Sequence, residues 1–223
     1  MSIPTGPWQP PAAAPTPSAQ GLTPYPGYPL VVDRRPGPIA SFFFVGSWLA
    51  LMWLLEGIDV VTGGALDSLG VSPRIIGELP QIFTAPFLHF GFGHLMANTI
   101  PFLVLGTLTR MSGRREFWVA TLSSIVVSGL LTWLISAPGS VTAGASGLVF
   151  GWLGYLLLRG LFARNWVQIL IAAAVFGFFG GMLWGVFPTL PGVSWQAHLG
   201  GILGGVLAAW GLHRKANTAP GLR

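Results

Sequence analysis

WVQILIAAAVFGFFGGMLWGVF, residues 166–187, is a stretch of twenty-two residues without a charge. A helix needs about 20 apolar residues to cross the hydrocarbon core of a bilayer, so this stretch predicts a membrane span. Five further apolar segments of comparable length lie at 39–61, 93–109, 116–136, 145–163 and 196–213. The sequence therefore predicts an all-α membrane protein whose domain, residues 39–213, is a bundle of six transmembrane helices.

The overall composition supports a membrane environment. Of 223 residues, 52% are hydrophobic and only 8% are charged, whereas a water-soluble domain is about a quarter charged. The formal net charge is +5, but the basic residues occur singly or in pairs between apolar segments, which argues against a nucleic-acid partner. The chain has no cysteine, so disulfides and a thiol nucleophile are excluded.

The two ends of the chain differ from the apolar region between them. Residues 1–38 contain eleven of the nineteen prolines, a composition that predicts a disordered tail. Residues 214–223 form a second, short tail. Nine of the eleven basic residues lie before the first segment, after the last, or in the connections that follow the second and fourth segments. Arg159 lies near the end of the fourth segment, on the same side, and only Arg74 lies elsewhere. The positive-inside rule therefore predicts that both termini are cytoplasmic and that the number of crossings is even.

Polar residues near the starts of the even-numbered helices are the candidates for chemistry, because polar groups within a bilayer are costly and usually functional. Ser146 and His198 begin the fourth and sixth segments, and His94 with Asn98 begins the second. At about 1.5 Å per residue, all four lie roughly 18 to 27 Å from the arginines at the cytoplasmic ends of their helices. They are expected to occupy one layer near the outer surface.

A serine and a histidine in one layer suggest nucleophilic catalysis, in which the imidazole takes the hydroxyl proton. Small residues at Gly147 and Gly151, and at Gly201, Gly205 and Ala209, allow the two helices to approach closely. Every acidic residue belongs to another region, so a Ser-His dyad is expected rather than a triad.

A tetrahedral intermediate also needs hydrogen-bond donors for its negative charge. The expected donors are the His94 ring, the Asn98 amide and the Ser146 backbone N–H, with Gly144 beside them in the substrate-contacting region. Taken singly, a serine among small residues is usually a packing feature, and an intramembrane histidine can carry protons or bind a metal. A metal site is not favoured, because His89 and His94 are five residues apart and no carboxylate joins them.

The candidate residues resemble those of the rhomboid intramembrane serine proteases, over residues 39–213. The matching stretches are His89-Phe-Gly-Phe-Gly-His94-Leu-Met-Ala-Asn98, Gly144-Ala-Ser146-Gly147-Leu-Val-Phe150-Gly151, and Ala197-His198-Leu-Gly-Gly201 with Gly205. The resemblance implies Ser146 as nucleophile, His198 as base, His94 and Asn98 as oxyanion contacts, and no cofactor. It also implies that Phe150 stacks on the catalytic histidine and that His89 lines a water-filled cavity.

The resemblance further implies that helix five and the loop at 188–195 act as gate and cap, and that the substrates are transmembrane proteins. One copy of the chain suffices for the site, and a bacterial plasma membrane fits the short six-helix form. Two departures stand out: Pro80-Gln81, where many relatives carry Trp-Arg, and Arg110, near where relatives often carry glutamate. The alternatives are a non-catalytic rhomboid-like protein that binds transmembrane helices, and a small transporter.

Overall fold

The structure, a computed structural model, describes residues 35–189 and 191–214. Nearly all of the tail predicted at 1–38, and all of the tail predicted at 214–223 except Arg214, therefore lies outside the described residues. Within the described residues the chain is helical, and its one β-type pairing is an isolated bridge between Val71 and Thr142.

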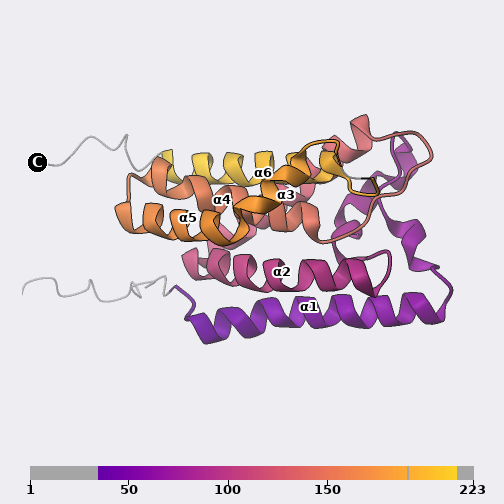
Figure 1. Cartoon of the computed structure of the whole chain (residues 1–223), viewed down its shortest axis with the longest axis horizontal. Coiled ribbons are helices and arrows are strands. Elements are labelled where there is room, and N and C mark those ends of the chain that lie inside the picture. The colour runs from indigo at the N-terminus through magenta and orange to yellow at the C-terminus, as the bar shows by residue number, and fades with distance from the viewer. Residues whose placement is uncertain (1–34, 190, 215–223) are drawn as a thin grey trace, which may run out of the picture. The chain divides into compact units, whose positions relative to one another are not determined.

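Six α-helices follow one another along the described part of the chain (Figure 1), and their ends agree with the predicted segments to within three residues, except at the end of the fifth. They are α1 (Pro38–Val61), α2 (Phe92–Ser112), α3 (Arg114–Ile135), α4 (Ser146–Ala163), α5 (Trp166–Phe179) and α6 (Trp195–His213). The same described residues form four 3-10 helices: η1 (Leu66–Leu69), η2 (Ile76–Phe83), η3 (Ala85–Phe87) and η4 (Gly180–Val186).

The fifth predicted helix changes its winding part of the way along. It is α-helical as far as Phe179 and continues as the 3-10 helix η4 from Gly180 to Val186. The change falls at the pair Gly180 and Gly181, and glycine is the residue that holds an α-helix least well after proline. The apolar segment therefore consists of an α-helix followed directly by a 3-10 helix, a feature that hydropathy alone does not indicate.

Helix α4 lies at the centre of the bundle, in contact with α2, α3, α5 and α6 (Figure 1). Two thirds of its most apolar 18-residue stretch is buried within the protein, whereas only 11% of the corresponding stretch of α5 and η4 is buried. A helix that is apolar on all sides is either enclosed by protein or faces lipid. The protein encloses α4, and the large exposed apolar surface of α5 is suited to lipid.

The contact between α4 and α6 is made by glycines, as predicted from their spacing. A Cβ atom added to Gly201 would overlap the carbonyl oxygen of Gly147, and one added to Gly205 would overlap that of Gly151. The two backbones are thus in direct contact where Gly147 meets Gly201 and where Gly151 meets Gly205. This approach brings the first turns of α4 and α6 together.

Five helical segments of the described chain are long and apolar enough to cross a membrane: α1, α2, α3, α4, and α5 with η4. Helix α6 has 19 residues, including Gln196, His198 and five glycines, and it is not among these five segments. It packs along α3 and α4 inside the bundle. The predicted all-α membrane bundle is confirmed, and the chain is a multi-pass integral membrane protein.

Arg159, expected near the cytoplasmic turn that follows the fourth segment, is buried near the end of α4. It lies inside α4, it is 6% exposed, and its guanidinium donates a hydrogen bond to the Ser112 hydroxyl at the end of α2. Arg110 also lies within a helix, in the last turn of α2, with its guanidinium 4.8 Å from the centre of the Phe44 ring. Both side chains are held by neighbouring helices.

The long connection from α1 to α2 is ordered and packs against the loop that precedes α4. Val71 and Thr142 exchange two backbone hydrogen bonds of 2.8 and 3.0 Å. Trp133 of α3 donates its ring N–H to the Ile75 carbonyl. Gln81, one of the two residues that depart from the resembled pattern, donates to the Ser68 carbonyl within the connection itself.

Candidate active site

The first turns of α4 and α6 bring Ser146 and His198 together. Ser146 is the first residue of α4, and His198 lies in the first turn of α6, where the Ser194 hydroxyl caps the helix by accepting the Ala197 N–H. The distance between Ser146 Oγ and His198 Nε2 is 2.9 Å. This is a normal hydrogen bond, and it has the geometry that proton transfer from serine to imidazole requires.

The other nitrogen of His198 bonds to a backbone carbonyl. His198 Nδ1 is 2.9 Å from the Gly185 oxygen in η4. A carbonyl can only accept, so Nδ1 carries the proton and Nε2 of the neutral ring is free to accept from the serine. Gly185 therefore fills the orienting position that a carboxylate occupies in a triad.

The ring of His198 is also fixed by stacking. Its centroid is 4.0 Å from that of Phe150, and the two planes are 6° apart. The ring of Phe150 lies one turn along α4 from Ser146. A Cβ atom added at Gly185 would come within 2.9 Å of His198 Nδ1 and 3.0 Å of Phe150 Cζ, so the stacked pair fits only because residue 185 has no side chain.

Ser128 of α3 contacts the first turns of both α4 and α6. It is buried, and its hydroxyl donates to the Ala197 carbonyl over 2.8 Å. It also lies against Gly147, where a Cβ atom would overlap its oxygen. One side chain thus joins α3 to the first turns of both α4 and α6, next to Ser146 and His198.

His94 and Asn98 lie together near the start of α2. The His94 ring adjoins Gly144, where an added Cβ atom would be 2.6 Å from the His94 Cε1 atom. Gly144 has a φ of +129°, a backbone conformation that residues with a side chain rarely adopt. Asn98 is buried, and its amide donates to the His94 carbonyl over 3.2 Å, which leaves its second N–H available.

His89 is buried, in contrast to the cavity-lining position that the resemblance implies. It is 1% exposed, and its Nε2 atom accepts the backbone N–H of Ala145 over 3.3 Å. Its ring is 5.1 Å from that of His94, edge to face. Burial, and secondarily the neighbouring His94, lower the pKa of His89 to about 3.

Two contributors to the site escape sequence reasoning. Gly185 acts through its carbonyl, which every residue possesses, so no residue type could have indicated it. Ser128 is one of several serines on α3, and nothing in the sequence distinguishes it from Ser124, which bonds to its own helix at the Ala120 carbonyl. The roles of both residues can be recognised only from the way the helices pack.

The chain matches one protein family over most of the membrane bundle. The Rhomboid domain family matches residues 76–215. This range includes every candidate site residue, from His89 to Gly205.

Known proteins of several bacteria are similar to the chain. An uncharacterized protein of Mycobacterium tuberculosis is 41% identical over 85% of this chain and 82% of its own length. The putative rhomboid protease YdcA of Bacillus subtilis is 28% identical over 78% of this chain and 87% of its own. The rhomboid protease GluP of the same organism is 29% identical over 77% of this chain, which corresponds to 34% of that longer protein.

Proposed function

The chain belongs to the rhomboid family, and from that premise we propose that it is an intramembrane serine endopeptidase with a Ser146-His198 dyad. The observation that carries the proposal is the 2.9 Å hydrogen bond between Ser146 Oγ and His198 Nε2. The two residues come from separate helices, and His198 is held in the tautomer that can accept a proton. Two relatives named as rhomboid proteases add support.

The reaction follows from this geometry. His198 takes the Ser146 proton while the hydroxyl oxygen attacks the carbonyl carbon of the scissile peptide bond. The negative charge on the tetrahedral oxygen is stabilised by the Ser146 N–H, in the first turn of α4, and by His94 and Asn98 of α2. His198 then gives its proton to the leaving amine. A water molecule, activated by the same imidazole, releases the acyl group from Ser146.

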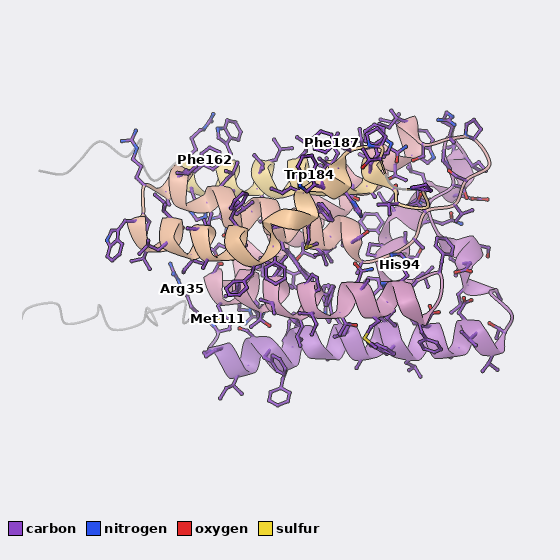
Figure 2. The ribbon with its side chains drawn as sticks, viewed as in Figure 1. Arg35, His94, Met111, Phe162, Trp184 and Phe187 are labelled. Carbon is purple, nitrogen blue, oxygen red and sulfur yellow. The ribbon has the colours of Figure 1, made fainter. Side chains whose placement is uncertain are left out.

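The proposed substrates are transmembrane proteins, which reach the site from the lipid. The α5–η4 segment is the least buried of the five candidate spans, and η4 contributes the Gly185 carbonyl to the site. Trp184 and Phe187 lie on and just after η4 (Figure 2), with exposed fractions of 72% and 51%. We assign this segment, with the loop that follows it, the role of gate and cap.

The proposed location is a bacterial plasma membrane, with both termini in the cytoplasm. The similarity to bacterial proteins supports the first part. The second part rests on the distribution of arginine. One copy of the chain contains both members of the dyad, so the proposed reaction needs no second subunit.

The decisive experiment replaces the nucleophile. With purified protein in liposomes, Ser146→Ala should lower the rate of cleavage of a model transmembrane substrate by more than about a thousandfold. It should also abolish labelling by a fluorophosphonate. Ser140→Ala, in the exposed loop before α4, is the matched control and should leave both unchanged. Cleavage retained by a folded Ser146→Ala protein contradicts the proposal.

The rival is a rhomboid-like protein that binds transmembrane helices without cutting them. It predicts that the unmodified chain neither cleaves nor reacts with the fluorophosphonate, while binding persists in Ser146→Ala. The two functions are therefore separated by the same set of measurements.

A further inference from the structure

Three backbone N–H groups of the loop before α4 donate to the α1–α2 connection. Thr142 N donates to the Val71 carbonyl over 3.0 Å, and Gly144 N donates to the Ala85 carbonyl over 2.9 Å. Ala145 N differs from these two donors, because its acceptor is a side-chain atom, His89 Nε2, at 3.3 Å. The residue directly before Ser146 is therefore held by an imidazole.

The surroundings of His89 determine which form of the imidazole is present. An Nε2 atom that accepts a hydrogen bond carries no proton, so in the neutral ring the proton is on Nδ1. His89 is 1% exposed, and among the described residues its Nδ1 atom has no hydrogen-bond partner. The titratable group that faces it is His94, at 5.1 Å between ring centroids. Neither feature would stabilise a positive charge.

The contact also affects which backbone donors remain for the substrate. Helix α4 starts at Ser146, and the N–H groups of a first turn have no partner within the helix. His89 accepts the N–H of Ala145, and the N–H that follows it along the chain is that of Ser146 itself. The imidazole thus ties down one donor beside the nucleophile and leaves the nucleophile's own donor available.

We propose that His89 is a positioning residue: its neutral imidazole accepts the Ala145 N–H and so holds the Ser146 backbone where the hydroxyl meets His198 and the N–H meets the developing oxyanion. This role rests on the proposed protease function. It assigns His89 an action through Ala145 and Ser146, without contact with the substrate.

The choice of acceptor atom allows a matched pair of variants. The side-chain oxygen of glutamine reaches the position of Nε2, whereas that of asparagine reaches only the position of Nδ1. His89→Asn should lower kcat about tenfold, the equivalent of one hydrogen bond of about 1.4 kcal/mol, with KM nearly unchanged. His89→Gln should recover most of this loss. Thermal unfolding establishes that both variants are folded.

Equal rates for the two variants, whether normal or reduced, would overturn the proposal, since the two amides place their oxygen at different positions. His89→Met matches glutamine in length but has no amide oxygen, so it should be as slow as His89→Asn; a rate equal to that of His89→Gln would show that the residue only fills space. If the unmodified protein neither cleaves nor reacts with a fluorophosphonate, the protease function itself fails, and the positioning role fails with it. An active unmodified protein with equal variants overturns the positioning role alone.

A second measurement reads the tautomer of His89 directly. In lipid bilayers, 15N magnetic resonance of the unmodified protein should show, besides the Nδ1-protonated His198, a second neutral histidine that is protonated on Nδ1 and stays neutral well below pH 6, because burial depresses the pKa of His89. The spectrum of His89→Gln assigns this signal by its loss. A His89 protonated on Nε2 could not accept the Ala145 N–H, and that result would overturn the proposal.

Discussion

At the scale of single residues, the site depends on glycines, which have no side chain, as much as on its polar side chains. Gly185 offers His198 a carbonyl in place of a carboxylate, and it can do so at 2.9 Å because no Cβ atom intervenes. Gly144 likewise leaves room for the His94 ring. The polar side chains that a motif search finds are therefore accompanied by glycines that set their positions.

A substitution at Gly185 tests the orienting contact. In Gly185→Ala the new methyl group would meet His198 Nδ1 and Phe150 at about 3 Å, so the ring must shift away from the carbonyl. We expect kcat to fall about tenfold or more, which corresponds to the loss of one hydrogen bond. The measurement is the rate of cleavage in liposomes, together with the rate of fluorophosphonate labelling.

The control for this variant lies in the same 3-10 helix. A Cβ atom at Gly181 meets nothing within 4 Å, so Gly181→Ala should cleave at close to the unmodified rate. If Gly185→Ala is as active as Gly181→Ala, the carbonyl does not orient the base.

At the scale of helices, most of the fold could be predicted because each helix is an independent apolar segment bounded by polar or glycine residues. The start of α4 at Ser146 and the start of α6 at Trp195 were predicted to within one residue. The contact between them followed from the glycine spacing. The 3-10 winding of η4 was not predicted, since the hydropathy of an apolar segment does not distinguish a 3-10 turn from an α-helical one.

The burial of His89 could not be predicted for a related reason. The residue lies in a connection that has no helical or strand periodicity, so its sequence does not indicate which side faces the protein. Only the packing of η3 and the loop before α4 determines this. The same holds for the burial of Arg159: its position near the end of the fourth segment indicates the cytoplasmic side, but not that neighbouring helices enclose the side chain.

The glycine contact between α4 and α6 leads to a prediction about stability. Gly201→Ala would place a methyl group on the Gly147 carbonyl oxygen, and separating two packed helices typically costs about 1 to 3 kcal/mol. The melting temperature in detergent should fall accordingly. Gly211→Ala, on the same helix with open space around the added Cβ atom, should be no less stable than the unmodified protein, because alanine favours helix. A Gly201→Ala protein as stable as Gly211→Ala would contradict the packing.

At the scale of the whole bundle, arginines mark one end. Arg35 precedes α1, Arg110 and Arg114 flank the α2–α3 turn, and Arg164 ends α4. Arg74 lies in the connection at the other end. Figure 2 shows Arg35, Met111 and Phe162 towards one end of the helices and His94 towards the other. Positive residues favour the cytoplasmic side, so the proposed active site should open away from the cytoplasm.

The absence of cysteine from the chain makes this orientation directly measurable. Ala137 is exposed in the loop between α3 and α4, and Arg115 is exposed at the start of α3. In intact bacterial cells without an outer membrane, Ala137→Cys should react with a membrane-impermeant maleimide. Arg115→Cys should react only after the membrane is opened, because about 30 Å of hydrocarbon separates the two sides. The reverse pattern would place Ser146 and His198 near the cytoplasmic surface, and the proposed substrates would then be cut from the other leaflet.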